Sequence, residues 1–260
     1  MNMIHLVAVP EQRRERSKQQ KRERILAAAA RVLDDQGLRG FAVKAVADEA
    51  DVSVGTVYNY FASKTALLVA LRAHAIDTLR ASYTNAQPVL DAFLDDEGLA
   101  SDLRALVPLC AFGGFWAAAS VVLADEFHLQ RALLSEPIDF RSTDELRQAL
   151  PVVLRLLELP SSLLDRAVKL ELLEPHDNRE RALVWVAALN GVLLLDQLAA
   201  VDRHLFRAPH LAEMVTIDLL VGWGADRADV EVATSHVRKL AAVAPLAPRP
   251  DGPGYRGPAT

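Results

Sequence analysis

The sequence predicts an all-α protein with a small N-terminal helical domain and a larger C-terminal one. Apolar residues recur at i, i+3 and i+4 along most of the 260-residue chain, the spacing that gathers them on one face of a helix. No sustained alternation of apolar and polar residues, the mark of half-buried strands, occurs in the sequence. Hydrophobic residues make up 51% of the chain, which is enough to bury a core and argues against wholesale disorder.

Charge is divided unequally along the chain. The formal net charge of −5 separates into +4 for residues 1–86, with 13 basic and 9 acidic residues, and −9 for residues 87–260, with 16 basic and 25 acidic. Seven basic residues lie close together near the N-terminus: Arg13, Arg14, Arg16, Lys18, Lys21, Arg22 and Arg24. We expect residues 1–17 to form a disordered basic arm. Such an arm supplies phosphate contacts in nucleic-acid binders, although a solvated charged terminus is the alternative.

The first helix is expected to start at the capping-box spacing of Ser17 and Gln20 and to end at Gly37 and Gly40. Two short helices follow, at 43–50 and 54–60, with a tight turn between them. Their inward faces are small and apolar, through Val43, Val46, Ala47, Ala50, Val52 and Val57. Two short helices joined in this way are typical of a helix-turn-helix, whose second helix enters the major groove of DNA.

The second short helix carries the side chains that such a groove requires. Ser53 is placed to cap it, and Gly55 lets the backbone approach DNA closely. Asn59 can bind adenine through two hydrogen bonds, and Val54 can touch a thymine methyl group. Four further residues are donors suited to phosphate oxygens: Thr56, Tyr58, Tyr60 and Lys64.

The segment VADEADVSVGTVYNYFASK closely resembles the DNA-binding domain of the TetR family of transcriptional regulators. The resemblance covers about residues 20–85 and implies that Lys44 and Val54–Tyr60 contact double-stranded operator DNA, with Lys64 on a phosphate. It further implies an all-helical homodimer whose variable C-terminal domain binds a small effector. We place the DNA-binding domain at 18–62 and the effector-binding and dimerisation domain at 63–244.

Three positions depart from the family pattern. Ala42 replaces the usual Thr before the second helix and loses a cap worth about 1 kcal/mol. Asp51 replaces the usual Gly of the turn, although Asp tolerates a left-handed backbone better than most residues. Thr65 replaces a frequent acidic residue. These departures bear on operator affinity more than on the fold.

The helices of the C-terminal domain have readable boundaries. A long helix from Ser63 is expected to stop before Pro88, and Pro160 is expected to break the chain. The stretches 182–206 and 209–223 look like the family's dimerisation pair, which would place two recognition helices about 34–36 Å apart on a palindromic operator. Residues 245–260 hold five prolines and three glycines, so we expect no fixed structure there.

Aromatic residues in this domain suggest a cavity for a hydrophobic effector. We select Phe112, Trp116 and Trp185, with Asn190 as a polar group on an apolar helix. The same spacing is more often that of a plain hydrophobic core.

Other functional classes find little support in the sequence. We identify no catalytic motif, no metal-ligand spacing and no cofactor-binding loop, and Cys110 lies in apolar surroundings where a thiol is inert. A helical enzyme or carrier that uses the apolar C-terminal cavity remains the alternative.

The uncharged stretch 105–124 is long enough to span a bilayer. We expect instead a buried helix preceded by a break at Pro108–Gly114, in a cytoplasmic protein without a membrane partner. A regulator tethered to the membrane through this stretch is the third reading.

Overall fold

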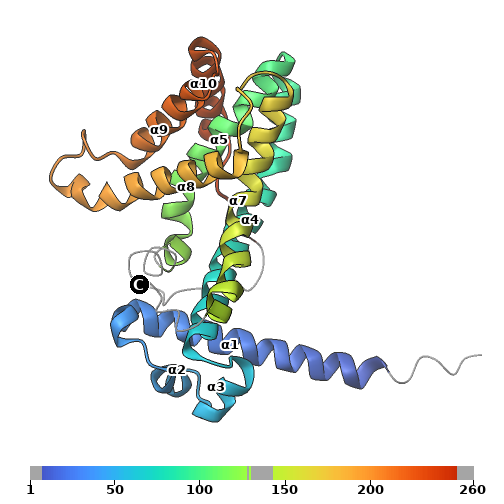
Figure 1. Cartoon of the computed structure of the whole chain (residues 1–260), viewed down its shortest axis with the longest axis vertical. Coiled ribbons are helices and arrows are strands. Elements are labelled where there is room, and N and C mark those ends of the chain that lie inside the picture. Colours follow the sequence, from blue (N-terminus) through green and yellow to red (C-terminus); the bar gives the residue numbers. More distant parts are fainter. Residues whose placement is uncertain (1–7, 128, 130–142, 251–260) are drawn as a thin grey trace, which may run out of the picture. The chain divides into compact units, whose positions relative to one another are not determined.

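A computed structural model describes residues 8–127, 129 and 143–250, and every regular element in those ranges is helical (Figure 1). The all-α prediction is therefore confirmed. The elements are α1 (Ala8–Gly40), α2 (Val43–Glu49), α3 (Val54–Tyr60), α4 (Lys64–Asp96), α5 (Ser101–Val122), α7 (Thr143–Lys169), α8 (Asn178–Leu194), the 3-10 helix η1 (Leu195–Ala200), α9 (Ala208–Gly222) and α10 (Arg227–Val243).

The chain divides into two compact units. Among the described residues, the first unit comprises 8–75, 129 and 143–149, and the second comprises 76–127 and 150–250. The first division falls after Ala75, whereas the sequence placed the domain boundary after residue 62. The difference arises because Leu67, Leu68 and Leu71 of α4 belong to the buried core of the first unit.

The first unit is a three-helix domain completed by the start of α4. Figure 1 shows α2 and α3 beside α1, and the helices meet around fully buried side chains. The core includes Ile25 and Leu33 of α1, Val46 of α2 and Val57 of α3. Burial of one such side chain contributes about 1.5–3 kcal/mol, so this small core can hold α2 and α3 in place.

The first helix begins earlier than predicted. Helix α1 starts at Ala8, so the prediction of a disordered arm over 1–17 is wrong for residues 8–17, and residues 1–7 lie outside the described part of the chain. Arg, Glu and Gln dominate residues 8–17, and all three are strong helix formers. At the other end, Gly37 (φ 65°, ψ 176°) leaves helical geometry, as predicted from its position.

The second unit is built around α5. This helix packs against α8, α9 and α10, and thirteen of its 22 residues are buried. By length and composition α5 could cross a membrane, but 72% of its most apolar window is buried inside the protein. That burial is the behaviour of a core helix in a globular domain.

Three predicted helix breaks are absent. Helix α4 runs through Pro88 to Asp96, α5 runs through Pro108, and α7 runs through Pro160. A proline inside a helix removes one backbone hydrogen bond, and tertiary burial beyond it outweighs the loss. In α4 that burial comes from Leu90 and Leu94, which follow Pro88 and are 7% and 3% exposed.

Gly113 and Gly114 do not interrupt α5; they make room for neighbouring segments that contact it. A Cβ atom on Gly113 would lie 2.1 Å from Oγ1 of Thr216 on α9, and one on Gly114 would lie 2.9 Å from Cδ1 of Leu246. The expected break at Pro108–Gly114 is therefore wrong. Both glycines allow neighbouring segments to approach α5 closely.

Two C-terminal predictions also need correction. The helix expected over 182–206 ends at Leu194 and continues as η1 and turns. Residues 245–250 of the predicted unstructured tail hold a defined path, with Ala247 buried and Ser82 Oγ donating a hydrogen bond to the Pro248 carbonyl at 2.7 Å. Residues 251–260 lie outside the described part of the chain.

Cys110 gives a direct test of the second unit. The chain has one cysteine, and it is buried on α5. Burial raises the pKa of its thiol to about 11, so the reactive thiolate is scarce at pH 8. Native protein is expected to resist iodoacetamide at pH 8 and to react fully after denaturation in urea. Rapid modification of the native protein, measured by mass spectrometry against the urea-treated control, would contradict this packing.

Candidate nucleic-acid interface

Buried side chains hold α3, the second helix of the helix-turn-helix, in place. Val57 is 1% exposed, and Phe61, the residue after α3, is 5% exposed. Ala47 of α2, also 1% exposed, is small enough to let the two helices come close. The faces of α2 and α3 that the sequence predicts to point inward are therefore the buried ones.

The turn between α2 and α3 uses the residues that the sequence singled out. Asp51 adopts φ 51°, in the left-handed region where glycine is usual. Ser53 is the N-cap of α3, and its Oγ accepts a hydrogen bond from the Thr56 amide at 3.1 Å. Ala42 caps α2 without any side-chain hydrogen bond, as expected from the loss of the family's Thr.

The outer face of α3 presents the predicted contact residues. Val54, Gly55, Tyr58 and Asn59 are exposed. Lys44, on α2, is also exposed, while Thr56 and Tyr60 are partly buried. The structure thus gathers an apolar group, an amide and two phenols on one short helix. This combination can reach base edges and phosphate oxygens together.

Lys64 has an intramolecular partner that the sequence did not indicate. Its Nζ donates a hydrogen bond to the Phe41 carbonyl at 2.6 Å and lies 5.6 Å from the centre of the Phe41 ring. An ammonium group has three donors, so two remain for an incoming phosphate. Lys64 therefore ties the first turn of α4 to the segment before α2, in addition to its predicted role.

Two arginines from α1 contact the ends of the recognition helix. The Arg22 guanidinium lies 5.3 Å from the centre of the Phe61 ring, and Arg24 Nη2 lies 3.5 Å from the Asp51 carbonyl. Sequence reasoning recognised both residues as part of a basic run but not as neighbours of α3. The i, i+3 spacing of Arg22 from the buried Ile25 was a signal that could have placed Arg22, whereas no such spacing from Ile25 applies to Arg24.

An ion pair joins α1 to the C-terminal end of α2. Arg31 Nε lies 2.6 Å from Oε1 of Glu49 in the last turn of α2. Both side chains are more than a third exposed, so the pair contributes little to stability and mainly sets the direction of α2.

The four residues predicted to bind an effector lie together in the second unit. Phe112 packs against Trp116 and Trp185 at ring-centre distances of 5.6 and 4.8 Å, and Trp116 Nε1 donates to Asn190 Oδ1 at 3.3 Å. Trp185 Nε1 donates to Thr216 Oγ1 at 3.2 Å. The three aromatic side chains are at most 2% exposed and satisfy their polar atoms within the protein. They form a packed core.

These features define a helix-turn-helix DNA-binding domain: a capped recognition helix held on a buried core, with exposed side chains able to read bases. The family model described as "Bacterial regulatory proteins, tetR family" matches residues 25–71. Residues 25–71 therefore match the DNA-binding domain of this family, and the resemblance predicted from the motif is confirmed for this segment.

Individual relatives agree with this assignment. The HTH-type transcriptional repressor KstR of Mycobacterium tuberculosis is 45% identical over 53 residues, which cover 20% of this chain and 24% of that protein. The chain thus matches about a quarter of the length of this curated relative.

Solved structures extend the similarity of fold to the C-terminal part. A transcriptional regulator from Rhodococcus sp. RHA1 has a TM-score of 0.52 at 20% identity, covering 77% of this chain and 96% of that one. The transcriptional regulator FadR from Bacillus subtilis, solved with stearoyl-CoA, has a TM-score of 0.52 at 16% identity, covering 76% and 97%. At these identities the similarity concerns the fold.

Proposed function

We propose that this protein is a cytoplasmic, dimeric transcriptional repressor that binds a palindromic operator and is released by a hydrophobic small molecule. DNA binding is supported by the exposed face of α3, which presents Val54, Tyr58 and Asn59 to solvent. The opposite side of the helix is anchored in the core through Val57. These three side chains are exposed to solvent, so this face is free to contact DNA.

The decisive test is binding to the DNA upstream of the protein's own gene. Wild-type protein is expected to shift this DNA selectively in an electrophoretic mobility assay, and its affinity should fall steeply with salt, because cations on the protein displace counterions from phosphates. Lys44→Ala should reduce the slope of log affinity against log salt by about one unit. Tyr58→Ala should lower the affinity but leave the slope of log affinity against log salt unchanged, because it removes no charge.

The matched control is Lys169→Ala, which removes another exposed lysine, from the end of α7. It should leave affinity and slope unchanged. If wild-type protein binds unrelated DNA equally well, or if Lys44→Ala behaves like Lys169→Ala, the proposed interface is wrong. We avoid Lys64 in this test because it also bonds to the Phe41 carbonyl.

The homodimer is supported by an exposed apolar stripe on α8 and η1. Leu183, Val184, Leu194, Leu195 and Leu198 are between 38% and 52% exposed, and Met214 on the adjoining helix α9 is 44% exposed. A contiguous exposed apolar surface of this kind marks an interaction site. Ala187 and Gly191, exposed in the middle of the stripe, would let a second copy of α8 approach closely.

The response to an effector is supported by α4, which contributes to the core of both units. Leu67 and Leu71 belong to the buried core of the first unit, and Ile76, Leu79 and Tyr83 are buried in the second. A ligand that binds one arrangement of α4 better would shift the population toward it. FadR was solved with stearoyl-CoA, and a hydrophobic effector for the present chain accords with that.

A further inference from the structure

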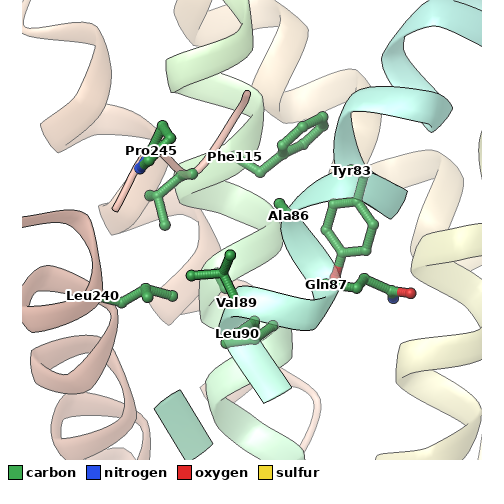
Figure 2. Close-up of a pocket in the computed structure, with 10 residues that line it drawn as sticks. Tyr83, Ala86, Gln87, Val89, Leu90, Phe115, Leu240 and Pro245 are labelled. Atoms are coloured by element: carbon green, nitrogen blue, oxygen red, sulfur yellow. The ribbon is translucent and has the colours of Figure 1, made fainter. Parts of the chain in front are cut away.

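The hollow that Figure 2 shows in the second unit is too small for a molecule larger than water. It lies between α4, α5, α10 and the segment after α10, and its volume is about 20 Å³. The Tyr83 side chain on its wall has a hydrogen bond with Gln87. A larger feature without an assigned partner is the charged surface of α1, in the first unit.

The first half of α1 is an exposed and strongly basic helix. Residues 13–24 carry seven basic and two acidic side chains and no apolar one. Residues 13–21 are all exposed, and the first described side chain of α1 in the buried core is Ile25. Figure 1 shows this part of α1 continuing as a regular helix past α2 and α3. A helix of this composition has no apolar face to bury, so a partner would have to be negatively charged.

One row of this basic helix continues the seam that α1 buries in the domain. Ile25, Ala28 and Val32 follow one another at spacings of three and four residues and are at most 5% exposed. Counting back from Ile25 by four, three and four residues gives three residues that we call the basic row: Lys21, Lys18 and Arg14. Residues at this spacing share one face of a helix. The basic row therefore lies on the side of α1 that faces the rest of the three-helix core.

Two contacts place the start of the basic row beside the recognition helix. Arg22, the residue after Lys21, lies with its guanidinium 5.3 Å from the centre of the Phe61 ring at the end of α3. Arg24 Nη2 lies 3.5 Å from the Asp51 carbonyl in the turn before α3. The basic row is about 10 Å long, which corresponds to about three base pairs of duplex. A duplex that lies against the outer face of α3 would therefore have the basic row along its flank.

Like charges crowd one another along this face in the free protein. Arg14 and Lys18 are four residues apart, as are Lys18 and Arg22, and like charges at this spacing destabilise a helix. Glu15 lies 4.0 Å from Lys18 Nζ, but both side chains are more than two thirds exposed, so the pair offsets little of this repulsion. The phosphates of a duplex would neutralise the face.

We propose that the basic row is a second DNA contact, which binds phosphates of the duplex beside the base pairs that α3 contacts. The contact is independent of sequence, because lysine and arginine side chains on phosphates read no base. It lengthens the DNA segment that the protein needs and raises affinity more than selectivity. The inference rests on the proposed function for the placement of α3 on DNA, whereas the charge of the basic row acts on any duplex.

Fluorescence anisotropy with a labelled duplex of unrelated sequence tests the basic row without an operator. The row variant carries Arg14→Gln and Lys18→Gln. The control variant carries Arg13→Gln and Arg16→Gln, which removes the same charge from the opposite side of the same helical turns. Glutamine is a good helix former, and circular dichroism should show equal helix content in both variants.

The two variants are expected to differ in their response to salt. Over about 50–200 mM salt, the row variant should lower the slope of log affinity against log salt by about two units for each protomer bound. The control variant should lower it by less than one unit, because its side chains point away from the duplex. Equal slopes in the two variants, whether reduced or unchanged, overturn the proposal.

The length of the duplex locates the contact beside α3. The upstream DNA is trimmed to the shortest duplex that wild-type protein binds with full affinity in the mobility assay. Trimming about three further base pairs from each end should weaken wild-type binding about tenfold, whereas the row variant should lose little, since it no longer contacts those phosphates. An equal loss in both proteins overturns the placement of the basic row on flanking DNA.

The outcome can be separated from that of the proposed function. Selective binding to the upstream DNA, with no difference between the row and control variants, would refute the second contact and leave the regulator intact. A difference between the variants on unrelated DNA, without selective binding to the upstream DNA, would refute the regulator and leave the basic row as a DNA contact.

Discussion

Gly113→Ala is expected to lower the free energy of unfolding by about 3 kcal/mol, through overpacking and the loss of a buried hydrogen bond. The new Cβ would lie 2.1 Å from Thr216 Oγ1, which accepts from Trp185 and donates to the Ala212 carbonyl. Thr216 is 2% exposed and cannot turn away without leaving these partners unsatisfied. The gain of about 0.5–1 kcal/mol from replacing glycine in a helix is too small to compensate.

Urea unfolding followed by circular dichroism measures this effect, at one fixed protein concentration because the proposed dimer would make stability depend on concentration. The matched control is Gly222→Ala at the end of α9, where an added Cβ meets no atom within 4 Å. That variant should be at least as stable as wild type. If the two variants unfold alike, α5 and α9 do not pack as closely as described.

Val184→Asp is expected to make the protein monomeric and to weaken operator binding at least a hundredfold. In the proposed dimer the new carboxylate would lie in an apolar interface without a cation, a cost of about 3–5 kcal/mol. A monomer would also engage a single half-site. Analytical ultracentrifugation reports the association and the mobility assay reports the affinity.

The control for this change is Val121→Asp, which introduces the same charge at a valine of α5 that is 75% exposed. It should remain dimeric and bind DNA as wild type does. A dimeric Val184→Asp protein would show that the exposed stripe on α8 is not the interface, and the proposal of a dimer would then need another surface.

The DNA-binding domain was largely predictable because its geometry depends on local signals. The cap at Ser53, the left-handed turn at Asp51 and the buried Val57 all follow from a residue type at a fixed place in a short motif. The partners of Lys64, Arg22 and Arg24 were not predictable in this way. They depend on which segments meet in three dimensions.

The C-terminal unit was harder to predict because tertiary packing overrides local preference there. Pro88, Pro108 and Pro160 were interpreted as helix ends, yet burial on both sides of each proline continues the helix. Phe112, Trp116 and Trp185 were correctly expected to be near one another, but nothing in their spacing separates a packed core from a cavity. The hydrogen bond from Ser82 to the Pro248 carbonyl joins segments far apart in the chain, which no periodicity could reveal.

The enclosed position of Cys110 makes this chain convenient for spectroscopic labelling. Since its one native thiol is buried, a cysteine introduced on the exposed face of α3 would be the only readily reactive one. A nitroxide attached there would report on its symmetry mate in a dimer through the dipolar coupling between two electron spins. The separation of the recognition helices in that dimer could thus be followed in solution, with and without DNA, and without altering the native cysteine.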